Sequence, residues 1–155
     1  KNMPLLSVDY MYILGKRKSY IEYYDLVETK DSTYLKLLNK LDSVIKNFDY
    51  LKNVEVTPDW HYSLLTVKTF KAGKIKNDKD LHSLLENSLM EYFISAKELQ
   101  NLNSEKLLQK KQITLEYTNG LIEKGGVSTD IFKKSLGTQA TKRFFDETLF
   151  GTANY

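Results

Sequence analysis

The segment LLTVKTFKAGKIK, residues 64–76, decides the fold class because its pattern fits two different secondary structures. As part of a helix, it follows an N-cap at Thr57 and a proline, Pro58, at the first helical position, and it stops at Gly73. One face of that helix carries Trp60, Leu64, Val67 and Phe70. As strand structure, the segment alternates apolar and polar residues and turns back at the glycine. We favour the helix, and we interpret the rare residues near His61 as a helix start rather than a site.

A second ambiguous segment, QITLEYTNGLIEK at residues 112–124, contains an Asn-Gly pair, which is a common hairpin turn. The longer stretch 103–126 nevertheless carries Leu108, Leu115 and Ile122 at heptad spacing. It also ends in two glycines that can stop a helix. The spacing therefore favours a helix here as well.

Apolar periodicity predicts helices in the rest of the chain. The strongest signal is DSTYLKLLNKLDSVIKNFDYLKN, residues 31–53, where apolar side chains recur at steps of three and four and Asp31 or Ser32 supplies the N-cap. Further helices are predicted over residues 7–27, with Gly15 as a potential break, and over 77–100, 128–137 and 141–151.

Together these segments predict an all-α fold, a compact irregular helical bundle of about five main helices plus short C-terminal helices. They form a single domain over residues 1–155. The alternative is an α+β fold with one or two β-hairpins near 62–76 and 112–124. The chain starts at Lys1 and not at methionine, which favours a fragment of a longer or processed, exported protein. No apolar run reaches the ~18 residues that a transmembrane segment needs.

The composition excludes several kinds of catalytic site. There is no cysteine, which excludes disulfides, thiolate catalysis and cysteine-ligated metals. A histidine base could only be His61 or His82, and no Gly-x-Ser-x-Gly elbow or Gly-rich phosphate loop is present. Asp78, His82 and Glu86 are spaced four apart, but a di-metal bundle needs Glu-x-x-His pairs that the chain lacks. We expect no metal, no cofactor and no catalytic residue, so an enzyme using carboxylates or a histidine is the third-ranked hypothesis.

Lysines gather in one short segment and provide the second-ranked hypothesis. Lys68, Lys71, Lys74 and Lys76 follow one another without an intervening acid. Lysines attract phosphates through counterion release, and a nearby aromatic ring can stack on a base. The scarcity of arginine and the small net charge of +3 argue against sequence-specific DNA binding. The segment 68–76 therefore predicts weak, sequence-tolerant nucleic-acid binding.

Tyrosine is abundant, with 11 in the chain. Tyr20, Tyr23 and Tyr24 become surface neighbours if residues 7–27 form a helix. Tyrosine combines apolar area with a hydroxyl that stays hydrated, which suits a partner surface or a small-molecule groove. The first-ranked hypothesis is therefore a non-catalytic binding or interaction module that uses this aromatic helix face or groove. Its partner is another protein or a small ligand.

Overall fold

Residues 5–24 form an antiparallel hairpin and not the helix predicted over 7–27. In the computed structural model, which describes residues 1–154, β1 (Leu5–Ile13) and β2 (Lys16–Tyr24) pair along their whole length. Leu14 and Gly15 join them, both with positive φ as in a type I′ hairpin turn. Tyrosine and isoleucine have high strand propensity, and β2 is paired on both sides, so pairing overrides the weak helical spacing.

The segment at residues 64–76 is mostly strand, so the predicted all-α bundle is wrong and the fold is α+β. β4 (Leu65–Lys74) runs through Gly73 without turning and pairs with β2 from far earlier in the chain, so it is not half of a local hairpin. The predicted helix start lies in a loop and in η1 (Tyr62–Leu64), a short 3-10 helix. The apolar spacing misled because Val67 faces the core whereas Phe70 points to the opposite face of the sheet.

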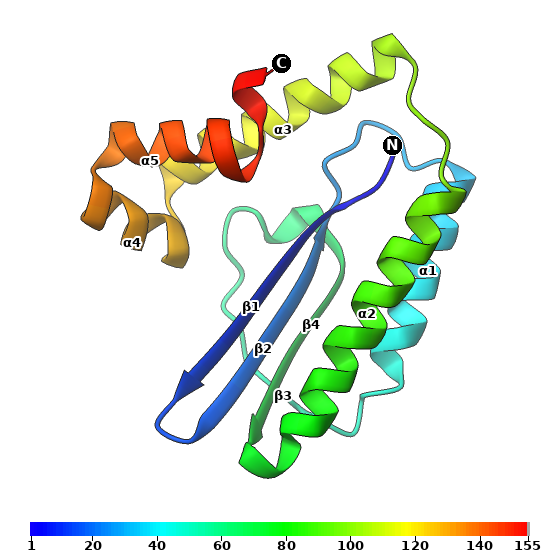
Figure 1. Cartoon of the computed structure of the whole chain (residues 1–155), viewed down its shortest axis with the longest axis vertical. Coiled ribbons are helices and arrows are strands. Elements are labelled where there is room, and N and C mark those ends of the chain that lie inside the picture. The colour runs from blue at the N-terminus through cyan, green and yellow to red at the C-terminus, as the bar shows by residue number, and fades with distance from the viewer. Residues whose placement is uncertain (155) are drawn as a thin grey trace. The chain divides into compact units, whose positions relative to one another are not determined.

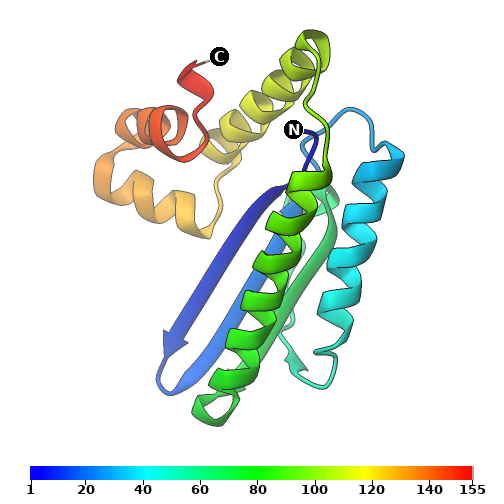
Figure 2. The ribbon, with the colours of Figure 1, turned by 45° about the vertical axis from the view of Figure 1, so that its right-hand side comes forward.

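Within residues 1–154 the sheet has four antiparallel strands in the order β1-β2-β4-β3, where β3 is the two-residue strand Lys52–Asn53. β2 and β4 therefore occupy the centre. The helices α1 (Ser32–Lys46) and α2 (Asp78–Glu98) lie side by side on one face of the sheet (Figures 1 and 2). η2 (Ile75–Asn77) links β4 to α2.

Side chains of the central strands alternate between the two faces of the sheet. We call the face that packs on α1 and α2 the inner face, and the opposite face the outer face. The ring of Tyr23 on the inner face lies 5.9 Å from that of Tyr92 of α2, between centroids. The buried inner-face residues of β2 and β4 are Ser19, Ile21, Tyr23, Leu65, Val67, Thr69 and Lys71.

The helices predicted over 31–53, 77–100 and 103–126 are confirmed as α1, α2 and α3 (Ser104–Lys124), each with shorter bounds. Asp31 caps α1 by accepting hydrogen bonds from the amides of Thr33 and Tyr34. The stripe that α1 buries contains Tyr34, Leu37, Leu38, Leu41 and Ile45. The Asn-Gly pair lies inside α3, so the alternative hairpin near 112–124 does not form.

The chain divides into two compact units. Unit 1 contains residues 1–25 and 29–101, with the whole sheet, α1 and α2; unit 2 contains residues 26–28 and residue 102 onward. Unit 2 is helical: α3 is followed by α4 (Val127–Leu136), α5 (Thr138–Phe144), η3 (Phe145–Leu149) and η4 (Thr152–Asn154). Its core is aromatic, formed by Tyr117, Phe132, Phe144, Phe145 and Phe150.

Among residues 1–154, none of the helices combines the length and the hydropathy needed to cross a bilayer.

Candidate functional site

The outer face of the sheet collects aromatic and charged side chains from β2, β4 and the loop before η1. Its centre is a pair of rings, because the strand register places Tyr20 of β2 directly opposite Phe70 of β4. The ring centroids are 5.6 Å apart and the planes are tilted by 52°. Both side chains are partly exposed. The two rings therefore form an accessible aromatic platform on the central strands.

Lysines surround this platform on the same face. By strand alternation, Lys16 and Lys18 share the face of Tyr20, and Lys68 and Lys74 share that of Phe70. Lys52 pairs with Ala72 in the strand register and so lies on this face as well. Two acids, Asp9 and Glu22, also belong to this face. Among these strand residues the outer face thus carries five lysines against two carboxylates.

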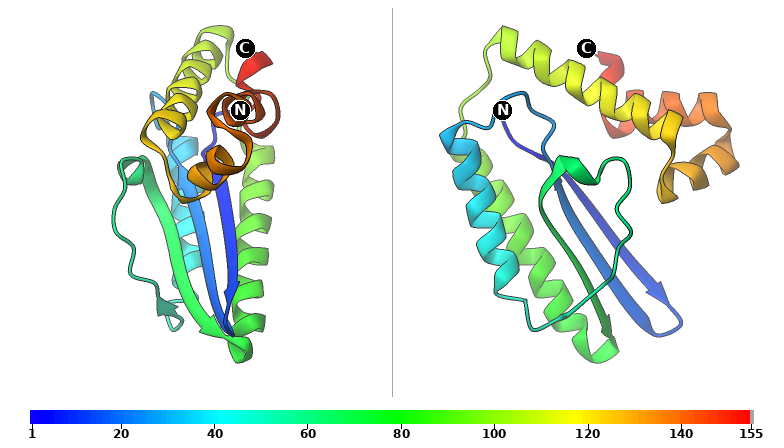
Figure 3. Two further views of the ribbon diagram at one scale, coloured as in Figure 1. Left: turned by 90° about the vertical axis from the view of Figure 1, so that its left-hand side faces the viewer. Right: turned by 180° about the vertical axis from the view of Figure 1, so that it is seen from behind.

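The loop before η1 adds rings at one end of the outer face. Figure 3 shows the segment between β3 and β4 on the side of the sheet away from α2. Within it, the ring of His61 lies 5.6 Å from that of Tyr24 and 5.3 Å from that of Trp60. The ammonium of Lys68 lies 4.4 Å from the centroid of Tyr62 and donates a 2.9 Å hydrogen bond to the carbonyl of Leu65. The rare residues thus pack against the outer face and do not start a helix.

A chain of polar contacts links that loop to β2. The Tyr24 hydroxyl donates to Glu22 Oε2 at 3.0 Å, and His61 Nδ1 lies 3.4 Å from the same hydroxyl. His61 Nε2 lies 3.8 Å from the Asp59 carboxylate. These contacts fix the orientation of the Glu22 carboxylate beside the aromatic platform.

Burial changes the pKa of Glu22 and of His61. Burial raises the pKa of Glu22 above its ordinary 4.5, while the hydrogen bond from Tyr24 acts in the opposite direction and nearby Asp9 adds to the rise. Burial also lowers the pKa of His61 below 6.5, although Asp59 opposes this. His61 is therefore neutral at neutral pH, and the charge of Glu22 is more easily lost on acidification than that of an exposed glutamate.

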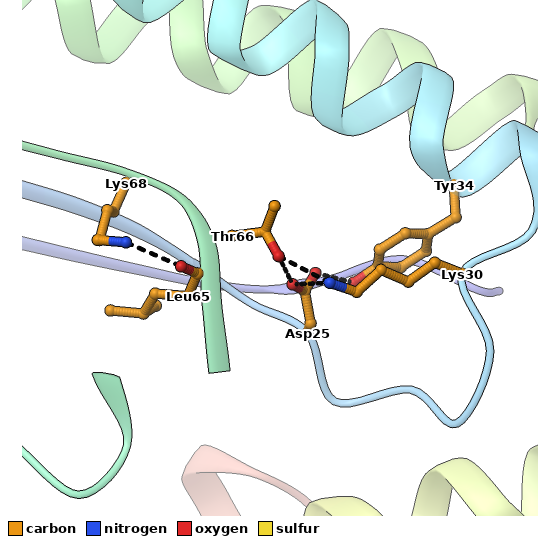
Figure 4. Close-up of polar contacts among 6 residues, drawn as sticks. All are labelled: Asp25, Lys30, Tyr34, Leu65, Thr66 and Lys68. Atoms are coloured by element: carbon orange, nitrogen blue, oxygen red, sulfur yellow. Dashed lines mark hydrogen bonds and ion pairs between the residues drawn. The ribbon is translucent and has the colours of Figure 1, made fainter. Parts of the chain in front are cut away.

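Asp25, directly after β2, holds this end of the sheet together (Figure 4). Its carboxylate accepts hydrogen bonds from the Tyr34 hydroxyl at 2.7 Å, from Lys30 at 2.6 Å and from the Thr66 hydroxyl. Its amide donates to the carbonyl of Leu64 at 2.8 Å. The register between β2 and β4 shifts next to this point. Asp25 thereby ties α1 to the start of β4, from which the loop with His61 emerges.

The structure distributes the residues singled out from the sequence over both faces. Tyr20, Lys68 and Lys74 lie on the outer face, and Lys76 is exposed in η2. Tyr24 is on the same side but is buried against His61. Tyr23 is buried against α2, so the three tyrosines do not form one surface.

Lys71 is also on the inner face, with 2% of its surface exposed. It donates to Asn53 at 2.9 Å and lies 3.6 Å from a carboxylate oxygen of Asp49. The segment 68–76 is therefore not a continuous basic surface, because alternate residues point to opposite faces.

The row of Asp78, His82 and Glu86 does not assemble a metal site. Asp78 accepts a 2.9 Å hydrogen bond from Arg17, and His82 and Glu86 are exposed on α2. In the described part of the chain, no group of three or more His, Asp or Glu side chains is placed to hold a metal ion.

The sequence interpretation missed Lys16, Lys18, Lys52 and Phe70 as members of one surface. Alternation in KRKSYIEYY and LTVKTFKAGK is the signal that could have found them, since Lys16, Lys18 and Tyr20 share one parity in the first segment and Lys68, Phe70 and Lys74 share one in the second. That signal identifies a surface only after both segments are assigned as neighbouring strands.

Neither a comparison with models of known protein families nor one with curated proteins finds a match for the chain. The function is therefore inferred from the geometry of the outer face.

Proposed function

We propose that the protein is a non-catalytic binding module that holds single-stranded nucleic acid on the outer face, without sequence preference. The observation that carries this proposal is the pairing of Tyr20 with Phe70 at the centre of a face that also carries five lysines. The proposal keeps the aromatic binding module and the nucleic-acid ligand expected from the sequence, but the surface is a sheet and not a helix.

Stacking supplies the first part of the affinity. Every base has a flat π-face, so rings on an exposed sheet can bind bases of any sequence, and each stacked base contributes about 1–3 kcal/mol. Tyr20 and Phe70 are adjacent across the strands and partly exposed, which lets one or two unpaired bases reach them. A double helix hides its base faces, so single strands are the favoured ligand.

Phosphate attraction supplies the second part. Lys16 and Lys74 are paired directly across β2 and β4, and Lys18 and Lys52 each pair with Ala72 from either side. Lysine binds phosphate as a point charge and does not recognise a particular base edge. Both arginines are already paired with acids, Arg17 with Asp78 and Arg143 with Glu147. These features favour sequence-tolerant binding.

The test is a titration of a fluorescein-labelled oligothymidine followed by anisotropy, with the wild type and Phe70→Leu. Loss of one stacked base should raise the Kd of Phe70→Leu at least about fivefold. Phe93→Leu is the matched control, because Phe93 is exposed on α2, on the other side of the sheet from the platform. Equal Kd values for Phe70→Leu and the wild type would reject stacking on this face.

Salt dependence tests the lysines independently of the rings. For single strands, log K changes with log salt by roughly −0.7 for each phosphate contacted. Lys74→Gln should make that slope less steep by about 0.7, the value for one phosphate contact. Lys36→Gln, an exposed substitution on α1, should leave it unchanged. An unaltered slope for Lys74→Gln together with weaker binding for Lys36→Gln would place the contact on the helices.

A further inference from the structure

The turn between β1 and β2 has an unusual residue at its apex. Leu14 is 97% exposed and has φ 49, and Gly15 follows with φ 76. Type I′ turns favour asparagine or glycine at the first position, because at positive φ the Cβ atom crowds the backbone, and glycine has no Cβ while the short polar side chain of asparagine can hydrogen-bond locally. A leucine here is unfavourable for the backbone and gains nothing from burial. Strain of this kind often accompanies a function for the side chain.

Other apolar side chains surround that apex. Tyr12 and Ile13 are the last two residues of β1; Ile13 is 50% exposed, and Tyr12 is 63% exposed although the Arg17 guanidinium lies 4.4 Å from its ring centroid. The register pairs Lys16 with Lys74, so Ile75, which is 67% exposed, lies at the same end of the sheet as the turn. Figure 1 shows the β1–β2 turn and the start of α2 at that end. We call these four residues, Tyr12, Ile13, Leu14 and Ile75, the apolar tip.

Positive charge flanks the apolar tip. Lys16 follows the turn directly, and Lys74 and Lys76 stand on either side of Ile75; all three are exposed. Two acids stand in the first turn of α2. Asp78 is paired with Arg17 at 2.9 Å and so does not offset these lysines, and Asp80, which accepts a hydrogen bond from Tyr50, leaves the three lysines in excess. An apolar end flanked by three lysines is complementary to a bilayer with anionic headgroups. Apolar groups enter such a bilayer to a depth of about 5–10 Å, and the lysines attract the negative charge of its surface.

We propose that the apolar tip inserts into the headgroup region of an anionic lipid bilayer, with Lys16, Lys74 and Lys76 against the lipid phosphates. A bilayer is favoured over a protein partner because stable protein interfaces use about 20–30 residues on each side, and the tip presents a two-residue turn and its neighbours. This inference is independent of the proposed nucleic-acid binding, which uses the rings at the centre of the outer face.

The experiment is co-sedimentation with vesicles of equal parts phosphatidylcholine and phosphatidylglycerol, compared with pure phosphatidylcholine vesicles. The wild type should sediment with the anionic vesicles at low salt, and Leu14→Asn/Ile75→Asn should partition at least about tenfold less. Asparagine suits positive φ, so the change at the turn relieves strain and does not threaten folding. Phe93→Leu, on the exposed surface of α2, is the matched control and should sediment as the wild type does.

Fluorescence locates the contact. The chain has one tryptophan, Trp60, away from the apolar tip, so the difference between Leu14→Trp and the wild type reports the tip alone. We expect the emission maximum of the tryptophan introduced at position 14 to shift to shorter wavelength when anionic vesicles are added. Sedimentation of Leu14→Asn/Ile75→Asn equal to that of the wild type would overturn the proposal. Concentration-dependent dimerisation without lipid, lost in the same variant, would also overturn it and assign the tip to a second copy.

Crossed variants separate this proposal from nucleic-acid binding. Leu14→Asn/Ile75→Asn should lose vesicle binding and keep the oligothymidine Kd, whereas Phe70→Leu should show the reverse. Vesicle binding that falls with Phe70→Leu but not with the tip variant would mean that the outer face, and not the tip, contacts the lipid. Failure of oligothymidine binding alone would leave the tip proposal standing.

Discussion

The rings of Tyr20 and Phe70 lie 5.6 Å apart because β2 and β4 pair in a register that sets the two residues directly opposite each other. The adjacent pair on the same face, Glu22 opposite Lys68, places a carboxylate and an ammonium beside the rings. Every second residue of the two central strands faces outward, and this places the aromatic rings next to charged side chains. This outward-facing set of residues is the structural basis of the proposed binding surface.

The two rings should act as one platform in binding. We expect Tyr20→Leu and Phe70→Leu each to weaken oligothymidine binding. The double variant should lose less binding free energy than the sum of the two single losses, because both rings contact the same bases. Anisotropy titrations of the four proteins measure this coupling. Tyr23→Phe, on the inner face, is the control and should bind as the wild type does. Strictly additive losses would indicate two independent contacts.

Glu22 should make stability depend on pH in a defined direction. Its pKa is raised in the folded protein, so the folded state holds the proton more tightly than the unfolded state. The protonated Glu22 therefore adds to the free energy of unfolding below the ordinary pKa of 4.5. This added stability is lost as the pH rises through the raised pKa of the folded protein. Glu22→Gln should therefore be more stable than the wild type at neutral pH, and the difference should vanish at acidic pH.

Urea denaturation of both proteins across this pH range measures the effect of Glu22. Removing the carboxylate should also strengthen oligothymidine binding at neutral pH, since one repulsive charge leaves the outer face. Weaker binding by Glu22→Gln would instead mean that the carboxylate accepts a hydrogen bond from a base.

Leu14→Asn should stabilise the protein. An ordinary side chain at positive φ costs about 1–2 kcal/mol, and asparagine tolerates that conformation better than leucine. We expect a gain of about 1 kcal/mol and a rise in Tm of about 2–4 °C. Leu14→Ala keeps the strain and loses no buried area, so it should melt close to the wild type. A fall in Tm for Leu14→Asn would show that the exposed leucine contributes to the fold.

Asp25→Ala should destabilise the protein by about 3 kcal/mol, because it removes the acceptor of Lys30 and leaves the buried Tyr34 hydroxyl without that partner. Asp42→Ala is the matched control: its ion pair with Lys46 is exposed on α1, so its loss should leave the stability close to that of the wild type. Chemical denaturation measures both. Similar losses for the two variants would mean that Asp25 does not hold α1 against β4.

Lys71 should respond to substitution unlike the other lysines of its strand. Its stem is buried between the sheet and the helices, whereas its partner Asp49 is largely exposed and can be hydrated alone. Lys71→Met should therefore change stability by less than about 1.5 kcal/mol and leave oligothymidine binding unchanged. Lys74→Met should weaken binding. Weaker binding by Lys71→Met at unchanged stability would place its charge in the site.

The helices could be predicted from the sequence and the sheet could not. α1 was recognisable because its cap at Asp31 and its apolar stripe from Tyr34 to Ile45 are encoded within fifteen neighbouring residues. The stretch 7–27 carries apolar residues at spacings that suit a helix, but it also alternates. The choice between the two patterns depends on a partner strand that begins at Leu65.

The candidate site was predictable only in its residue types. Lysines with aromatic rings indicated nucleic-acid binding through residues 68–76, and Tyr20 and Tyr24 indicated an aromatic surface. The contact between His61 and Tyr24, and the separation of Lys71 from Lys74 onto opposite faces, follow from strand geometry. His61 was assigned to a helix start because the residues around it contain good capping signals.

Short stretches of neighbouring residues are enough to predict α1, α2 and the helices of unit 2, because their caps and apolar periodicity are encoded locally. The composition likewise excludes cysteine chemistry. Pairing in the folded sheet makes residues 5–24 and 65–74 strands, because a strand leaves its backbone hydrogen bonds unmade until another strand meets it. The platform of Tyr20 and Phe70 is a consequence of that pairing.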